Sequence, residues 1–188
     1  MKSIINKIIY FVLILMFLIA LPSLAPAINN ERINMPSSQW EERFIAIINE
    51  MKMIDTDKPV FTISEHPGYG FEHALDLSNF IRVAYYDKGD GAFDSAVLTI
   101  DLDGVGKLTE QVWYAIIATT FAGERRATTD QVIELVNAIC PIFDQILAGK
   151  ERVTGAQTAT LHGVGYGLEF YEHGRFARFY TNANLTRK

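Results

Sequence analysis

The chain has 188 residues, of which 49% are hydrophobic, and its 22 acidic against 17 basic side chains give a net charge of −5. An acidic chain without a basic cluster is a poor ligand for nucleic acid or anionic lipid, so neither is an expected partner. The single cysteine, Cys140, excludes an internal disulfide framework, and stability therefore has to come from an apolar core.

Residues 1–27 have the three-part layout of a secretory signal peptide. Lys2 and Lys7 give a positive start, an unbroken apolar run occupies 8–21, and the sequence PSLAPA follows at 22–27. We expect export to the periplasm or the extracellular space, with the membrane met only transiently through this peptide. Without residues 1–27 the net charge falls from −5 to −7.

The cleavage site follows from the small residues at the end of this segment. Pro26 would stand immediately beyond a cut after Ala25, which disfavours it, so we predict cleavage between Ala27 and Ile28. The alternative is an uncleaved anchor helix, because residues 8–28 are just long enough to cross a hydrocarbon core of roughly 30 Å.

After a polar linker at 28–37, we expect a single domain over 38–188. It begins with an amphipathic helix at 38–53, whose apolar side chains recur at helical spacing: Trp40, Phe44, Ile47, Ile48 and Met51. Ser38, with Glu41 three residues later, has the pattern of a capping box and predicts the first turn of this helix.

The middle of the chain is typical of an antiparallel meander. Alternating or β-branched residues predict three strands, at 59–64, 79–87 and 94–101. The segment 65–73 is interpreted as a loop because a proline and two glycines interrupt it, Pro67, Gly68 and Gly70. The glycine-containing segment 87–91 predicts the hairpin turn before the last of these strands.

Two helices and three strands follow. The helix at 109–123 is apolar nearly all round, which indicates burial on most sides, and the helix at 128–149 has one apolar stripe with a kink expected at Pro141. Glycine turns separate the last strands, at 156–162, 164–172 and 175–182. We therefore predict an α+β domain with a largely antiparallel sheet of about six strands in two groups of three. Two long helices pack on one face, in addition to the N-terminal helix.

The sequence DLDGVGKLTEQV at 101–112 has two aspartates and a glycine where an EF-hand calcium loop carries them. Such a loop also needs ligands at its fifth and twelfth positions, which are Val105 and Val112 here. The residues before it predict a strand rather than a helix. We therefore interpret the segment as a turn from a strand to a helix capped by Thr109, and we predict no metal site.

Three adjacent Glu–His pairs supply the candidate catalytic residues. Four of these side chains, Glu65, His66, Glu72 and His73, fall in the predicted loop, where they can converge on a zinc ion or act as an acid–base pair without metal. This set defines the alternative function, a zinc or metal-independent hydrolase. Its spacing matches no metal-binding motif, and solvated loop histidines are the favoured interpretation.

Other catalytic and cofactor motifs are missing from the sequence. Cys140, in an apolar helix, is interpreted as a buried thiol, and no Gly-x-Ser-x-Gly elbow occurs. The glycine-rich segment 162–168 is followed by a strand rather than by the helix of a phosphate loop. We expect no cofactor.

The candidate binding residues lie in the last two strands. Three glycines alternate and leave one strand face without side chains, Gly163, Gly165 and Gly167. Close approach by another backbone, a helix or a ligand would explain them, and a strongly bent strand is the alternative. An aromatic and arginine-bearing surface lies beside them, formed by Tyr171, Arg175 and Arg178. The leading hypothesis is a non-enzymatic exported domain that binds a partner protein or a small ligand through its sheet surface.

Overall fold

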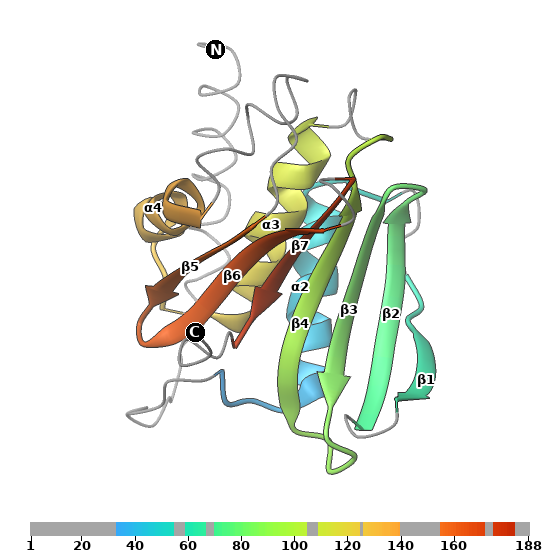
Figure 1. Cartoon of the computed structure of the whole chain (residues 1–188). Helices are drawn as coiled ribbons and strands as arrows, with labels where there is room; N and C mark the ends of the chain where they lie inside the picture. The colour runs from blue at the N-terminus through green and yellow to red at the C-terminus, as the bar shows by residue number, and fades with distance from the viewer. Residues whose placement is uncertain are drawn as a thin grey trace.

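The computed structural model describes residues 33–54, 59–66, 70–104, 109–124, 126–139, 155–171 and 175–182. Within these ranges the chain is an α+β protein with one antiparallel sheet of seven strands and three helices (Figure 1). The helices are α2 (Ser37–Glu50), α3 (Thr109–Gly123) and α4 (Thr129–Ile139). The strands are β1 (Thr62–His66), β2 (Gly70–Ser78), β3 (Ile81–Asp87), β4 (Phe93–Asp101), β5 (Gly155–Leu161), β6 (Val164–Tyr171) and β7 (Phe176–Thr181).

The sheet joins two antiparallel meanders. Strands β1 to β4 form the first and β5 to β7 the second, and the order across the sheet is β1-β2-β3-β4-β7-β6-β5. The meanders meet where β4 pairs with β7, with Leu98 opposite Phe179. At the same junction the backbone N–H of Ala96 donates to Oγ1 of Thr181 at 2.9 Å. The two predicted groups of strands are therefore halves of one sheet, and the first half has four strands instead of three.

The predicted loop at 65–73 is wrong, because all of its described residues lie in strands. β1 continues to His66, and β2 begins directly opposite it at Gly70. From Phe71 to Asp76 β2 alternates, with Phe71, His73 and Leu75 on one face and Glu72, Ala74 and Asp76 on the other, before the register shifts between Asp76 and Ser78. This period of two is a strand signal. The proline and glycines that precede it obscured that signal in the sequence.

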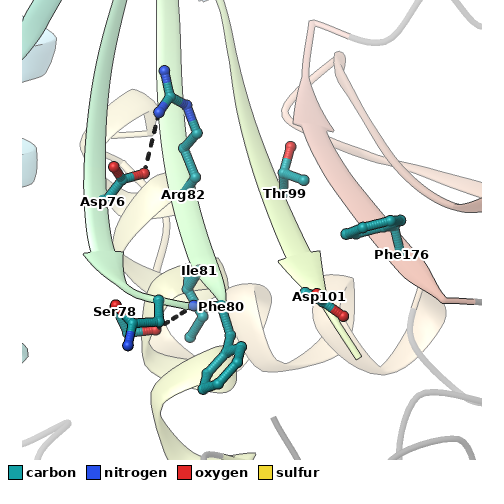
Figure 2. A pocket seen from close by; sticks show the side chains of 9 residues that line it. Asp76, Ser78, Phe80, Ile81, Arg82, Thr99, Asp101 and Phe176 are labelled. Carbon is teal, nitrogen blue, oxygen red and sulfur yellow. Dashed lines mark hydrogen bonds and ion pairs between the residues drawn. The ribbon is translucent and has the colours of Figure 1, made fainter. Parts of the chain in front are cut away.

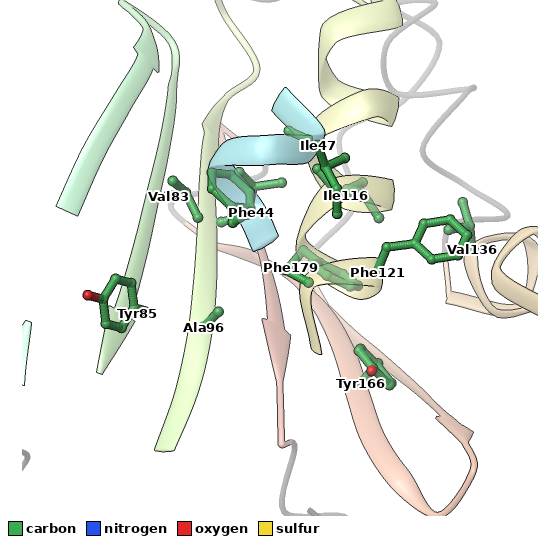
Figure 3. Close-up of a cluster of buried hydrophobic side chains, with 14 of the residues drawn as sticks. Phe44, Ile47, Val83, Tyr85, Ala96, Ile116, Phe121, Val136, Tyr166 and Phe179 are labelled. Atoms are coloured by element: carbon green, nitrogen blue, oxygen red, sulfur yellow. The ribbon is translucent and has the colours of Figure 1, made fainter. Parts of the chain in front are cut away.

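Helices α2 and α3 lie behind the sheet in Figure 1 and cover one of its two faces. They pack against each other and against β3, β4 and β7, so the apolar core lies between the helices and the centre of the sheet. Both layers contribute to this core, for example through Phe44, Val83, Ile116 and Phe179 (Figure 3). Helix α4 packs on β5 and β6, towards the opposite edge of the sheet from β1.

An aromatic cluster fills the core beneath α2. Trp40 is fully buried, and its ring stacks on Phe44 at 5.0 Å and on Phe93 at 5.4 Å between ring centres. Tyr85 of β3 tilts against the same indole at 5.3 Å. Aromatic pairs at such separations contribute about 0.5–1.5 kcal/mol each beyond their buried area, so this cluster fixes α2 on the sheet.

The predicted capping box at the start of α2 is wrong. Pro36 is the N-cap residue, and no side chain caps the helix. The backbone N–H and Oγ of Ser37 both donate to the carbonyl oxygen of Gly91, at 2.9 and 3.0 Å. Glu41 instead accepts a hydrogen bond from the hydroxyl of Tyr85. Contacts with the sheet therefore define the first turn, which a local pattern cannot reveal.

The helix predicted at 109–123 is confirmed. Its buried Thr119 and Thr120 have no access to water, and their hydroxyls donate to the carbonyls of the preceding turn at 2.8 and 2.9 Å. Helix α4 follows a capping box that is present in the structure. The N–H of Thr128 donates to Gln131 Oε1 at 2.9 Å, and the N–H of Gln131 donates back to Thr128 Oγ1 at 3.3 Å.

Residues at the two ends of the described chain are tied together. The backbone N–H of Ile33 donates to Oδ1 of Asn182 at 2.8 Å in a buried hydrogen bond. The side chain of Ile33 is also buried, and a Cβ on Gly123 would lie 2.4 Å from its Cδ1. The described end of the predicted linker is therefore packed against the domain.

Several predicted features fall outside the described residues: the signal peptide at 1–27 with its alternative as an anchor, Cys140, and the kink at Pro141. Among the residues that are described, no helix is long and apolar enough to cross a membrane.

Candidate functional site

The face of the sheet turned away from α2 and α3, which we call the open face, is the candidate site (Figure 1). Its side chains alternate along each strand with those of the core. Strand pairing aligns one row of them across five strands: Asp76 on β2, Arg82 on β3, Thr99 on β4, Arg178 on β7 and Glu169 on β6. Charges from distant parts of the sequence therefore form one line.

The charged groups of this row are held in ion pairs. Arg82 contacts Asp76 at 3.2 Å and Glu72 at 3.5 Å, and Arg178 contacts Glu169 at 2.9 Å. Exposed pairs of this kind stabilise a fold by only about 0–1 kcal/mol. Their main effect is on orientation, because Arg82 is drawn towards β2 and Arg178 towards β6.

Four planar groups form a continuous stack at the β6–β7 side of the open face. The guanidinium carbon of Arg178 lies 4.7 Å from the ring centre of Tyr171, whose ring stacks on Phe176 at 5.4 Å. The guanidinium carbon of Arg175 lies 4.8 Å from the centre of the Phe176 ring. The structure thus brings together the predicted Tyr171, Arg175 and Arg178 through Phe176. We call these four residues the arginine–aromatic stack. Each exposed cation–π contact is worth about 0.5–1 kcal/mol.

Arg175 connects this stack to the turn after β4. Its guanidinium contacts Asp101 at 3.4 Å and Asp103 at 3.7 Å. The carboxylate of Asp101 also accepts the backbone N–H of Asp103 at 3.1 Å, which is the geometry of an Asx turn. A strand precedes this turn and a helix follows it, as predicted, while residues 105–108 are outside the described ranges.

The three predicted glycines occupy two kinds of position. Gly163 lies in the turn before β6 with φ +82°, where a side chain would be strained. Gly165 and Gly167 are on β6 and belong to the open face, opposite Thr160 and Thr158 of β5. A Cβ on Gly167 would lie 2.3 Å from Cζ of Tyr180, so the tyrosine ring covers that glycine. An internal contact therefore accounts for Gly167.

A hollow with a volume of about 560 Å³ opens on the same face beside the stack (Figure 2). Its lining includes Asp76, Ser78, Phe80, Arg82, Thr99 and Phe176, and Asp101 lies at its rim near β7. Thr99 is small, and the neighbouring Arg178 is drawn away from it by Glu169, while Arg82 and its partner Asp76 line the hollow on the other side. The ion pair of Arg178 with Glu169 therefore helps to keep the space above Thr99 open.

The β2–β3 side of this site is not predicted by the sequence patterns described above. Arg82 alternates with two buried residues of β3, a pattern that could have marked it as outward-facing. Asp76 could not be placed, because the first residues of β2 were interpreted as a loop at 65–73 and no strand was predicted over 74–78. Thr99 has no distinguishing feature in the sequence, and its role depends on the pairing of β4 with β7.

Tyr86 also lies on the open face, and its hydroxyl donates to Oε2 of Glu72 at 2.9 Å. Burial raises the pKa of Tyr86 to about 12, with a further contribution from Glu72 and a partial opposing effect of Arg178 and Arg82. Because the folded-state pKa exceeds the unfolded value of 10.0, this group stabilises the fold fully below pH 10. That contribution is lost as the pH rises through about 12.

We expect Glu72→Gln to lower the pKa of Tyr86, because the amide removes a negative charge and a strong acceptor. The pKa should stay above 10.0, since burial is the larger cause. Ultraviolet absorbance of tyrosinate as a function of pH measures the change, and Tyr86→Phe identifies the titration that belongs to this residue. An unchanged titration in Glu72→Gln would show that Glu72 has no part in the shift.

The four side chains of the alternative hydrolase set do not share one loop. Glu72 and His73 are neighbours on β2 and point to opposite faces of the sheet. Glu72 binds the hydroxyl of Tyr86, whereas Nε2 of His73 lies 3.0 Å from Oδ2 of Asp87 on the helix side. Glu65 and His66 are on the edge strand β1.

His73 also stacks on the ring of Tyr85 at 4.4 Å between ring centres. The structure thus pairs this histidine with Asp87, a partner that sequence spacing did not indicate. In the part of the chain that the structure describes, no three His, Cys, Asp or Glu side chains are grouped so that they could hold a metal ion.

Another titratable pair connects the β5–β6 turn with the end of α3. Nδ1 of His162 lies 3.2 Å from Oε2 of Glu124, whose pKa is raised by burial and partly lowered again by this histidine. Beside it, Arg43 of α2 donates to the carbonyl of Phe121 at 2.6 Å. These contacts hold the hairpin and both helices together on the covered side of the sheet.

The fold and the open face together define an α+β protein whose antiparallel sheet is covered on one side by helices. No protein-family model matches this chain, nor does any curated protein or solved structure. A fold of this kind does not specify an activity, so the function has to be inferred from the chemistry of the site.

Proposed function

We propose that the chain is an exported, non-enzymatic binding domain that holds a partner protein or a small ligand on its open face. The observation that carries this proposal is the arginine–aromatic stack, in which Arg178, Tyr171, Phe176 and Arg175 lie in contact beside the hollow. Arginine and aromatic side chains are enriched among the residues that dominate binding energies.

The stack supports binding because its side chains are already ordered. An interface loses about 0.5–1.5 kcal/mol for each flexible side chain that it immobilises. Arg178 is held by Glu169 and Tyr171, and Arg175 by Asp101 and Phe176, so less of this cost remains for a ligand to meet. The opposite face of the sheet is occupied by α2 and α3.

Export is supported by the layout of residues 1–27, with cleavage after Ala27 and release into the periplasm or the exterior. An acidic domain in either compartment would bind its partner through specific contacts, since its charge of −7 repels nucleic acid and anionic lipid surfaces.

The double variant Tyr171→Ala/Arg178→Ala should reduce recovery of any bound partner from the native envelope by at least about 30-fold. That factor corresponds to the roughly 2 kcal/mol or more that a dominant interface residue contributes. Quantitative affinity purification with the wild-type protein and the variant as baits measures the ratio.

The matched control is Thr158→Ala/Thr160→Ala, because both threonines are exposed on the open face but lie on β5, away from the stack. This variant should recover the partner at the wild-type level, and both proteins should retain the wild-type melting temperature within a few degrees. Equal recovery by the stack variant and the wild type would contradict the proposal.

A further inference from the structure

We infer that the hollow beside the stack binds a neutral saccharide. This inference rests on the proposed function, because it names the ligand class of the same open face. The volume of about 560 Å³ is within the range of about 300–1,000 Å³ that is typical of small-ligand sites. The chemistry of the lining then decides between charged, apolar and neutral polar ligands.

A charged ligand is disfavoured because opposite charges at the hollow are already paired. Asp76 is joined to Arg82 at 3.2 Å, and Asp101 to Arg175 at 3.4 Å. An anion would lie close to two carboxylates, those of Asp76 and Asp101, and a cation close to the guanidinium of Arg82. Placing like charges side by side in a binding site costs several kcal/mol in many interfaces. A ligand without net charge leaves both ion pairs intact.

An apolar ligand is disfavoured because it would cover polar groups without replacing their bonds to water. The lining holds carboxylates, a guanidinium and the hydroxyl groups of Ser78 and Thr99. A buried donor or acceptor that loses its hydrogen-bond partner is destabilising, because its lost bonds to water are not replaced. The ligand must therefore offer hydrogen bonds along most of its surface.

A sugar ring meets both conditions. Each carboxylate has about four acceptor positions and a guanidinium has five N–H donors, so Asp76, Asp101 and Arg82 keep bonding capacity beyond their ion pairs. Ring hydroxyls both donate and accept, which matches a lining that holds both donors and acceptors. Phe80 supplies aromatic carbon for contact with the C–H groups of the ring, and Phe176 adds a ring edge, because Tyr171 and Arg175 already contact its faces.

The test uses saturation-transfer NMR on the purified protein with four neutral oligosaccharides as separate probes: maltotetraose, cellotetraose, chitotetraose and mannotetraose. We expect transfer to at least one of them. Tetragalacturonate and chitosan tetramer, which carry negative and positive charges on a similar skeleton, should receive none.

Thr99→Phe fills the floor of the hollow and should abolish the transfer. Its matched control is Thr160→Phe, the same change at an exposed open-face position on β5, which should leave the transfer unchanged. Phenylalanine suits a strand, and the melting temperatures of both variants check that the fold is kept. Arg82→Met adds no bulk, removes the guanidinium donors and should weaken the transfer several-fold.

Failure to detect transfer to any neutral probe would overturn the inference, as would transfer that persists in Thr99→Phe or transfer confined to the charged probes. These results are separable from failure of the proposed function. If Tyr171→Ala/Arg178→Ala loses a partner while every saccharide stays silent, the open face binds a partner and only the saccharide inference is lost.

Discussion

Trp40→Ala is expected to lower the free energy of unfolding by about 4 kcal/mol, within the range of about 3–5 kcal/mol for removal of a buried aromatic side chain. Trp40 has no exposed surface and contacts three rings, from Phe44 on its own helix, Tyr85 on β3 and Phe93 on β4. These rings belong to different elements, so the cavity cannot close by a small shift of one of them.

Trp40→Phe is the matched variant and should cost less than half as much. Among the described residues, the indole Nε1 of Trp40 is buried without a hydrogen-bond partner. Phenylalanine removes that unpaired donor while keeping an aromatic ring in place, which offsets part of the lost contact area. Urea unfolding of the three proteins measures both differences. Similar losses for the two variants would show that stacking in this cluster contributes little.

Gly70→Ala is expected to destabilise the protein by about 3 kcal/mol or more, by combining a strained dihedral with a backbone clash. A Cβ at this position would lie 2.0 Å from the carbonyl oxygen of Asp87 and 2.9 Å from Cα of Lys88. Neither atom can move without disturbing the pairing of β2 with β3, where Phe71 is opposite Asp87. Gly70 also has φ +90°, which costs an alanine about 1–2 kcal/mol on its own.

Gly91→Ala separates these two causes. Gly91 has φ +77°, close to that of Gly70, but a Cβ there would meet nothing within 4 Å. We expect only the dihedral cost, about 1–2 kcal/mol. Chemical denaturation gives both values. If the two alanine variants are equally destabilised, the clash of the added Cβ with the carbonyl oxygen of Asp87 contributes nothing to the loss of stability in Gly70→Ala.

Elements whose signals are local could be predicted from the sequence. The helix at 109–123 is long, apolar and bounded by a threonine and a glycine, and those bounds are found in the structure. The strands ending the chain were recognised because alternation is a property of consecutive residues. β2 has the same alternation, yet the preceding proline and glycines were given more weight. Proline and glycine indicate where the chain changes direction, and here Pro67, Gly68 and Gly70 lie just before or at the first residue of β2.

The site was predictable only where its residues share one hairpin. The β6–β7 turn separates Tyr171 from Arg175 and Arg178. Side chains alternate between the two faces on both strands of this hairpin, so residues near its turn that share a face lie close together. Arg82 and Asp76 join them through the pairing of β4 with β7, which no local pattern encodes. The same limit applies to His73, because its contact with Asp87 depends on the register between β2 and β3.

The pairing of β4 with β7 also determines when, during synthesis of the chain, the fold can be completed. Thr181 follows Ala96 by 85 residues, so at about 5–20 residues per second it is synthesised roughly 4–17 s later. Until then β4 has no neighbour on that side, and Asn182 is not present to hold Ile33. Local hairpins can form early, but the core cannot close before the last described strand is available. Folding is therefore expected to be a single late step, limited by long-range contacts, and the chain stays open during most of its synthesis.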